Sequence, residues 1–244
     1  MELLKHTLFI NLDQRVDRLA HATEQFKRMG IDAERVKGTK TAVGAVGCTM
    51  SHIKCIELAK QRNYDYVFIC EDDITFTNPA LLKKNMKLFL ENDEIQWDML
   101  IIGGNNVPPY HQVEEYCARV FYCQTTTGYI VKKEYYDTLL ANFKESVHNL
   151  VRNPENGREY ALDIYWKRLQ MRDFWYMITP PTVTQYESYS DIESKIVNYD
   201  DMMLDMEKKW YVERQEMLKQ EFIKHQQQQE ALVNVSMNLT SKKN

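Results

Sequence analysis

Short apolar, β-prone runs alternate with longer amphipathic segments along the first 180 residues of the chain. Typical buried-strand patterns occur at residues 7–12 (TLFINL), 64–76 (YDYVFICEDDITF) and 97–104 (WDMLIIGG). Shorter strands are predicted at 33–37, 120–123, 128–131 and 174–178. Helical patterns lie between them, at 13–29, 46–62, 79–90, 134–144 and 158–171. Because helices usually connect parallel strands, this alternation predicts an α/β sheet flanked by helices.

Particular residues mark where these helices should begin and end. Asp13 is expected to cap the first helix and Gly30 to end it. Asn78-Pro79 predicts the start of a third helix, because proline at the first helical position lacks only an N–H that would be unpaired there anyway. Gly44 and Gly47 are expected to let the backbone turn tightly into the second helix.

The composition changes near residue 199. Segment 199–231 is charged and rich in Met and Gln, and it contains no Gly or Pro, which favours a long helix. Four of its apolar residues nearly follow a heptad: Met203, Met206, Trp210 and Met217. The heptad fails at 213 and 220, so a single helix and a coiled coil that forms a homodimer are both open. We expect a domain of residues 1–198 and a helical tail of residues 199–244.

Composition and charge exclude several classes of protein. With 44% hydrophobic and 27% charged residues, the 244-residue chain is neither disordered nor collagen-like. Its net charge of −4 argues against a general nucleic-acid binder, which needs a basic surface. No run approaches 18 apolar residues, so no transmembrane helix is predicted. The N-terminus lacks the apolar core of a signal peptide, and a cytoplasmic location is therefore expected.

The cysteines suggest a reducing compartment. The chain has five of them: Cys48, Cys55, Cys70, Cys117 and Cys123. Their number is odd and no pair has CxxC spacing, so their pattern predicts neither a disulfide framework nor a zinc site. Buried or half-buried thiols are expected.

The sharpest chemical signal is the acidic run Glu71-Asp72-Asp73 at the end of a predicted strand. Strand side chains alternate, so Glu71 and Asp73 should share a face and Asp72 should point away. Adjacent carboxylates repel one another unless a cation is present, and their hard oxygens suit Mg²⁺ or Mn²⁺. The alternative is a solvated acidic turn that caps the next helix.

Other phosphate-binding motifs are absent from the sequence. It has neither GxxxxGK[ST] nor GxGxxG, and only eight glycines. This argues against P-loop NTPases and dinucleotide dehydrogenases. The pattern instead favours a nucleotide-diphosphate site in which a metal neutralises the phosphates.

Four further segments accompany the acidic run, and their order and spacing are informative. They are residues 10–18 (INLDQRVDR), 44–53 (GAVGCTMSHI), 126–131 (TTGYIV), and Gln185 followed by 190–192 (SDI). Together the five motifs resemble glycosyltransferase family 25, which includes lipooligosaccharide and collagen galactosyltransferases. The resemblance spans residues 7–195.

This resemblance implies a GT-A fold, a Rossmann-like α/β domain that uses a UDP-sugar donor and Mn²⁺ or Mg²⁺. Within the motifs, the sequence departs from the family pattern at two places. Val16 stands where the family often has proline, and Thr49-Met50 replaces a common Ala-Leu. These departures leave the identities of donor and acceptor open.

The motifs supply the expected binding residues. Glu71 and Asp73 are predicted metal ligands. Nucleotide contacts are expected from Asn11, Leu12, Arg15, Arg18, Ser51 and Asp72. Arginine can pair with phosphate or stack on a base, Asn11 could bond the uracil edge, and Asp72 would lie near the ribose or the metal. The alternative for the arginines is an ion-pair cluster with Asp13 and Asp17. His52 could meet the donor phosphates or serve in packing.

Acceptor contacts are expected from a second set of residues. They are Thr127, Tyr129, Gln185 and Asp191. Hydroxyls bond sugar hydroxyls and aromatic rings stack on sugar faces, although Thr and Tyr are also common in strands. Asp191 is in addition the second candidate for the catalytic base.

Asp163 is the first candidate for the general base. Its neighbours are apolar, and partial desolvation would raise its pKa towards a useful value. The alternative is an exposed helical Asp paired with Lys167. The sequence thus predicts a metal-dependent, inverting transfer of a hexose, galactose or glucose, from a UDP-sugar to a hydroxyl of a glycan or hydroxylysine-type protein acceptor. The rival predictions are an inactive nucleotide-sugar-binding module that assembles through its tail, and a metal-dependent hydrolase or nucleotidyltransferase.

Overall fold

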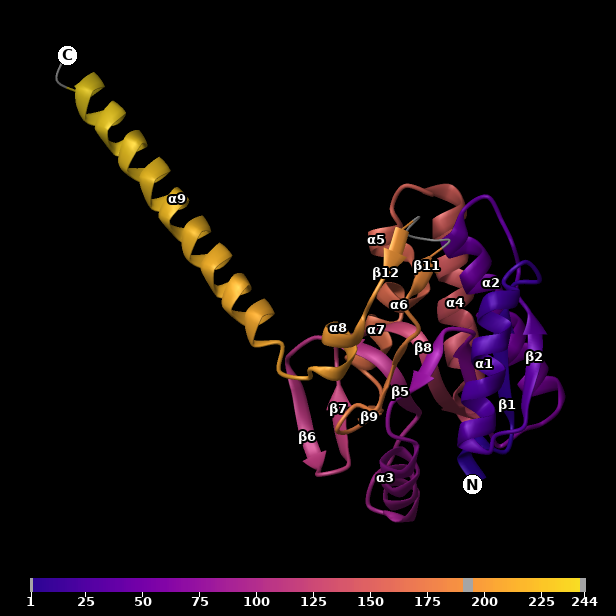
Figure 1. The fold of residues 1–244 in the computed structure, drawn as a ribbon. Helices are drawn as coiled ribbons and strands as arrows, with labels where there is room; N and C mark the ends of the chain where they lie inside the picture. Colours follow the sequence, from indigo (N-terminus) through magenta and orange to yellow (C-terminus); the bar gives the residue numbers. More distant parts are fainter. Residues whose placement is uncertain (1, 191–194, 242–244) are drawn as a thin grey trace. The chain divides into compact units, whose positions relative to one another are not determined.

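The computed structural model describes residues 2–190 and 195–241 (Figure 1). The chain forms two compact units, Met1–Met206 and Glu207–Asn244. The candidate chemistry lies in the first unit, and the second is a long helix.

An eight-stranded mixed sheet forms the centre of the first unit, in the order β2-β1-β3-β8-β5-β9-β7-β6. Its strands are β1 (Thr7–Asn11), β2 (Ala33–Lys37), β3 (Tyr66–Glu71), β5 (Met99–Asn106), β6 (Tyr110–Glu114), β7 (Cys117–Val120), β8 (Cys123–Lys132) and β9 (Trp175–Ile178). β2, β1 and β3 are parallel, as are β5 and β9, whereas β8 is antiparallel to both of its neighbours. The carboxyl ends of β2, β1 and β3 therefore lie at one edge of the sheet.

Four long helices cover the sheet. They are α1 (Val16–Met29), α2 (Gly44–Gln61), α3 (Pro79–Glu91) and α4 (Tyr136–Arg152). Alternation along β3 separates two apolar cores. Val67 and Ile69 pack in the same core as residues of α2 and α4. Phe68 and Cys70 pack in the other core, with residues of α1 and α3. Helices on both faces of an α/β sheet confirm the predicted fold class.

Shorter elements complete the unit. Two small sheets pair β4 (Ile74–Phe76) with β10 (Val183–Gln185), and β11 (Ser188–Ser190) with β12 (Lys195–Val197). The short helices are η1 (Glu2–Leu4), η2 (Lys133–Tyr135), α5 (Gly157–Tyr160), α6 (Leu162–Tyr165), α7 (Lys167–Gln170) and α8 (Asp200–Leu204). The single helix predicted at 158–171 is therefore wrong, since three short helices occupy this region.

Some predicted helix ends are confirmed and others are wrong. Gly30 ends α1 in the left-handed conformation, with φ 62°, and Asn78 caps α3 by accepting from the Leu81 N–H. Asp13 is not the cap of α1, which begins at Val16. The Asp13 carboxylate instead pairs with Arg35, 2.7 Å away, because β2 lies beside β1.

Glycine is needed at position 47 for a different reason from the predicted one. It lies inside α2 rather than at the turn before it. A Cβ at this position would lie 2.3 Å from the carbonyl oxygen of Thr39. Glycine is required because the loop after β2 passes against the helix backbone.

Two strand predictions also need correction. The segment 120–123 is not a strand, because Val120 ends β7 and Cys123 begins β8. The strand predicted at 64–76 is interrupted, since β3 ends at Glu71 and β4 begins at Ile74. Asp72 and Asp73 form the turn between them.

The second unit contains α9 (Lys209–Ser241), so the tail is helical as predicted. The helix does not begin near 199, because α8 is a separate short helix that belongs to the first unit. The homodimer remains a prediction. Among the described residues, no helix is both long and apolar enough to cross a membrane.

Candidate functional site

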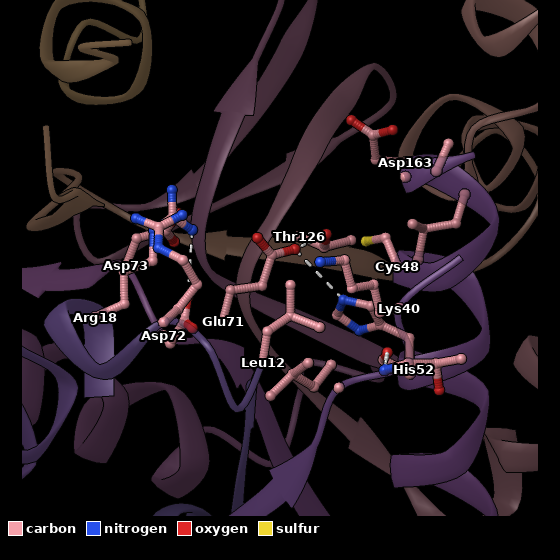
Figure 2. Close-up of a pocket in the computed structure, with 18 of the residues that line it drawn as sticks. Leu12, Arg18, Lys40, Cys48, His52, Glu71, Asp72, Asp73, Thr126 and Asp163 are labelled. Atoms are coloured by element: carbon pink, nitrogen blue, oxygen red, sulfur yellow. Dashed lines mark hydrogen bonds and ion pairs between the residues drawn. The ribbon is translucent and has the colours of Figure 1, made fainter. Parts of the chain in front are cut away.

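A cavity of about 400 Å³ opens at the carboxyl ends of the three parallel strands β1, β2 and β3 (Figure 2). The starts of α1 and α2, the loop after β2, β8 and α6 also contribute to its lining. Ligands of α/β sheets commonly bind at this edge, and the volume is in the range of small-molecule sites. The cavity contains most of the residues singled out in the sequence.

The acidic turn forms one side of the cavity. Arg18 of α1 pairs with Asp73 at 2.7 Å and with Asp72 at 3.2 Å. The Asn11 side-chain amide donates to Asp72 at 2.6 Å. Asn11, Asp72 and Asp73 are buried, and the Arg18 side chain is largely buried. The turn is therefore held by charge-assisted contacts and is not a solvated cap of the next helix.

The carboxylates of this turn are electrostatically strained. Burial and the nearby charge of Glu71 raise the pKa of Asp73 to about 8. Burial also raises the pKa of Asp72, although bonds from Asn11 and Arg18 oppose it. Among the described residues, Asp73 Oδ1 is buried without a hydrogen-bond partner. An unpartnered hard oxygen among like charges fits a divalent cation.

The predicted alternation of the three acids is wrong. All three line the cavity, and Asp72 does not point away from it. Asp72 and Asp73 both contact Arg18, whereas Glu71 lies against His52. The reason is that β3 ends at Glu71, so strand alternation does not extend into the turn.

The opposite side of the cavity is formed by α2 and β8. His52 Nε2 lies 3.4 Å from Glu71 Oε1, and the Thr126 hydroxyl donates to the same oxygen. The other ring nitrogen of His52 is hydrogen-bonded to the Tyr129 hydroxyl at 2.9 Å. Burial would raise the pKa of Glu71, but the bonds from His52 and Thr126 outweigh it and lower the pKa.

Asp163 reaches the cavity from the first turn of α6. Its Oδ2 accepts from the Thr125 N–H at 2.9 Å, and Thr125 has a positive φ of 73°. A β-branched residue rarely adopts this conformation, and such strain is often found at functional sites. Burial raises the pKa of Asp163. Lys167 does not form the alternative ion pair, since its amine donates to Gln124 at 2.6 Å.

The predicted nucleotide residues divide into two groups. Five of them line the cavity: Leu12, Arg15, Arg18, Ser51 and Asp72. Asn11 lies behind it, 1% exposed, with its Oδ1 accepting from Arg35 and its amide donating to Asp72. Asn11 therefore positions the acidic turn rather than reaching a base. Arg15 also pairs with Asp17 at 2.8 Å, which was the alternative for this residue.

The predicted acceptor residues are not all brought together. Gln185 lines the cavity from β10. Thr127 and Tyr129 are fully buried within β8 and do not line it, so they have no direct access to an acceptor. Asp191 lies outside the described residues.

Sequence reasoning missed several lining residues. Thr125 faces the cavity immediately before the motif 126–131, whose first residue, Thr126, also lines it. Lys40, in the loop after β2, also lines it. The available signal was a polar loop directly after a parallel strand, which is where ligand contacts usually arise in α/β sheets.

A protein-family model and a curated protein each match part of this chain. A family model described as "Glycosyltransferase family 25 (LPS biosynthesis protein)" matches residues 34–151. A Haemophilus influenzae protein named "Putative glycosyltransferase" is 29% identical over 120 residues. That alignment covers 40% of this chain and 40% of the relative.

Solved structures with a similar chain path are more distant. A197 from STIV has a TM-score of 0.45 at 11% identity, over 79% of this chain and 93% of that one. A glycosyltransferase involved in glycosylation of the major capsid of PBCV-1 has a TM-score of 0.47 at 11% identity, over 70% and 80%.

The region matched by the family model carries much of the cavity. It includes α2 with Ser51 and His52, the acidic turn with Asp73, and the strand with Thr126. It also contains three of the five motifs found in the sequence. Residues 34–151 of this chain are thus similar to glycosyltransferase family 25.

Proposed function

We propose that this chain is a metal-dependent glycosyltransferase. It transfers a hexose, galactose or glucose, from a UDP-sugar to a hydroxyl of a glycan or of a hydroxylysine-type protein acceptor. The observation that carries the proposal is that the acidic turn, Arg18 and Asp163 all line one cavity at the carboxyl ends of parallel strands. The match of residues 34–151 to a glycosyltransferase family supports the reaction class.

Glu71 and Asp73 are the residues that would hold Mn²⁺ or Mg²⁺. The buried Asp73 Oδ1, which lacks a partner among the described residues, is a hard donor of the required kind. When bound, the cation neutralises the diphosphate and stabilises the charge on the departing UDP. Asn11 and Arg18 keep the turn in place by bonding Asp72.

Basic side chains and one hydroxyl of the cavity bind the nucleotide or position the residues that bind it. Arg15 and Arg18 offer guanidinium groups to the phosphates from the start of α1. Ser51 bonds the Thr39 N–H at 2.8 Å and so fixes the loop after β2, where Lys40 faces the cavity. Asp72 remains the proposed contact to the ribose or the metal.

Asp163 acts as the general base in this proposal. It takes the proton from the acceptor hydroxyl while the acceptor oxygen bonds to C1 of the sugar and the bond from C1 to UDP breaks, with inversion. Its raised pKa makes it a better proton acceptor than an ordinary carboxylate. The Thr125 N–H holds one of its oxygens in place, and Gln185 is the proposed acceptor contact within the cavity.

A thermal-shift panel tests the proposal. UDP, UDP-galactose, UDP-glucose and UDP-N-acetylglucosamine are each added with Mn²⁺, Mg²⁺ or EDTA. A ligand at about 100 times its Kd adds about 2.7 kcal/mol of stability. We expect a metal-dependent shift with UDP and one UDP-hexose. Folded protein that responds to no UDP ligand would overturn the proposal, and binding without turnover would favour the inactive module.

A further inference from the structure

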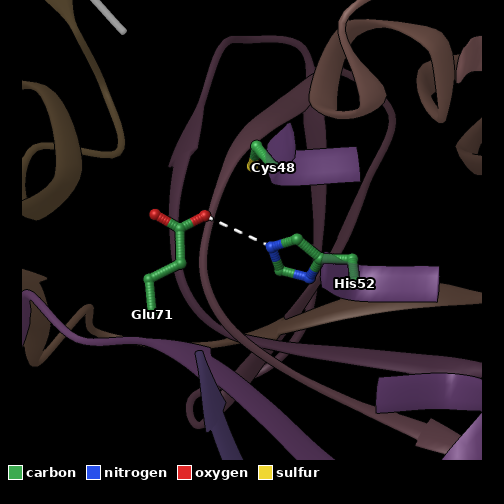
Figure 3. A group of neighbouring side chains, drawn as sticks. All are labelled: Cys48, His52 and Glu71. Carbon is green, nitrogen blue, oxygen red and sulfur yellow. Dashed lines mark hydrogen bonds and ion pairs between the residues drawn. The ribbon is translucent and has the colours of Figure 1, made fainter. Parts of the chain in front are cut away.

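A second group of possible metal ligands lies on the α2 side of the same cavity (Figure 3). Cys48 and His52 are four residues apart on α2, so they lie on the same helix face. Glu71 reaches them from the end of β3. One ligand atom from each side chain lies within 4.8 Å of the other two. The proposed transfer reaction gives no role to Cys48 or His52.

The spacing of these atoms suits one bound ion. Zinc bonds to nitrogen and oxygen ligands at about 2.0–2.2 Å, so two such ligands in a tetrahedron lie about 3.3–3.6 Å apart. His52 Nε2 and Glu71 Oε1 are 3.4 Å apart, which is long for a hydrogen bond between them. Thiolate and imidazole ligands favour Zn²⁺, whereas Mn²⁺ and Mg²⁺ favour oxygen.

Neighbouring groups orient two of the three ligands. The Tyr129 hydroxyl bonds His52 Nδ1 at 2.9 Å, which leaves Nε2 directed towards Glu71. Tyr129 is fully buried and packs edge-on against Trp166, so its hydroxyl is fixed. The Thr126 hydroxyl bonds Glu71. A hydrogen bond at the other ring nitrogen commonly orients a zinc-ligating histidine.

We propose that Cys48, His52 and Glu71 form a zinc-binding site whose remaining ligand position faces the cavity, and that Zn²⁺ bound there competes with the donor nucleotide. The competition rests on the proposed function, because it requires Glu71 also to serve the Mn²⁺ that accompanies the nucleotide. When zinc holds the Glu71 carboxylate on the α2 side, Glu71 can no longer bind Mn²⁺ together with Asp73. Zinc would therefore act as an inhibitor at this cavity.

Zinc titration of the full chain against a chromophoric chelator tests the site. We expect one Zn²⁺ per chain. Cys48→Ser should weaken binding at least about 10-fold, and Tyr129→Phe about 10–100-fold, through the lost bond to His52. Cys55→Ser is the control, since Cys55 lies on the same helix but within the apolar core. Wild-type protein that binds no stoichiometric zinc would overturn the site.

Cobalt supplies a spectroscopic readout of the cysteine ligand. Co²⁺ in the site should show a thiolate-to-metal charge-transfer band in the near ultraviolet, which Cys48→Ser removes and Cys55→Ser keeps. Circular dichroism of each variant checks folding. A wild-type cobalt complex with no thiolate band, or equal zinc affinities for wild type and Cys48→Ser, would contradict the assignment of Cys48.

A second titration separates the competition from the proposed function. The thermal shift caused by UDP with Mn²⁺ is measured with and without one equivalent of Zn²⁺, and the ratio is compared between wild type and Cys48→Ser. Zinc should abolish the shift in wild type and spare it in the variant. Equal shifts with and without zinc in wild type would overturn the competition. A chain that never binds UDP would overturn the proposed function and the competition, while the zinc site would still rest on the direct titration.

Discussion

The two sides of the cavity shift the pKa values of their carboxylates in opposite directions. On the side of the acidic turn, burial and the charge of Glu71 raise the pKa of Asp73 to about 8, and one of its oxygens lacks a partner among the described residues. On the α2 side, bonds from His52 and Thr126 lower the pKa of Glu71. A carboxylate with donors around it is stable as an anion, whereas a carboxylate beside other anions needs a cation.

Backbone structure explains this difference. The turn at Asp72 and Asp73 places successive acids side by side, and Arg18 forms an ion pair with each of them. The helix α2 places His52 beside Glu71, and β8 adds the Thr126 hydroxyl, which bonds Glu71, and the Tyr129 hydroxyl, which bonds His52. The side of the acidic turn is thus suited to a hard cation with its phosphate ligand. On the α2 side, His52 and Thr126 already donate to the Glu71 carboxylate. Glu71 lies between the two sides.

The largest expected effect comes from Asp73→Asn. Removing this carboxylate should abolish Mn²⁺-dependent UDP binding in the thermal-shift assay. It should also stabilise the metal-free chain. Because the pKa of Asp73 in the folded chain lies above the ordinary value of 3.8, the stabilising contribution of the protonated Asp73 is complete below about pH 4 and is lost as pH rises towards 8.

The stability difference between Asp73→Asn and wild type in EDTA should therefore grow between pH 5 and pH 8. Asp93→Asn is the control, because Asp93 is exposed in the loop after α3. A variant that keeps Mn²⁺-dependent UDP binding would exclude Asp73 as a metal ligand.

Asp163→Asn should have the next largest effect. The amide can still accept from the Thr125 N–H but cannot take a proton, so we expect kcat to fall about 10²–10⁴-fold with UDP affinity unchanged. Steady-state kinetics with the donor found in the panel measure kcat, and thermal shift measures UDP affinity. An unchanged kcat would remove Asp163 as the base.

Gly47→Ala tests the packing of the α2 side. The added Cβ would lie 2.3 Å from the Thr39 carbonyl oxygen, and we expect a loss of about 1–3 kcal/mol in the free energy of unfolding by denaturant titration. Gly157→Ala is the matched control, because a Cβ there meets no atom within 4 Å. Equal stabilities for the two variants would contradict the close approach of this loop to α2.

The smallest effect is expected from Ser51→Ala. Its hydroxyl donates to the Gly47 carbonyl at 2.7 Å and accepts from the Thr39 N–H at 2.8 Å, so its removal should cost about 1 kcal/mol of stability. Thr23→Ala provides a comparison, since the Thr23 hydroxyl bonds the Leu19 carbonyl on an exposed helix face, where the loss should stay within about 0.5 kcal/mol. The two values would coincide if Ser51 did not fix the loop.

Much of the fold could be predicted because its signals are local. The strand Ala33–Lys37 has the predicted bounds, and the end of α1 at Gly30 and the start of α3 at Asn78-Pro79 follow from capping within a few residues. The edge strand Tyr110–Glu114 was missed, since it is largely exposed and shows no apolar pattern. The short helices α5, α6 and α7 were predicted as one helix, because their sequence shows one continuous helical pattern.

The sequence by itself determined which charged residues follow predicted strands or have apolar neighbours, and so it identified Glu71, Asp73, Arg18 and Asp163, which line one cavity. Only the tertiary structure decided how they pair. Cys48 and Glu71 belong to different elements, and cysteine spacing alone indicated no metal site. Packing of α2 against β1 and β3 brings them together, because side-chain contacts between elements depend on register and helix rotation, which no local pattern specifies.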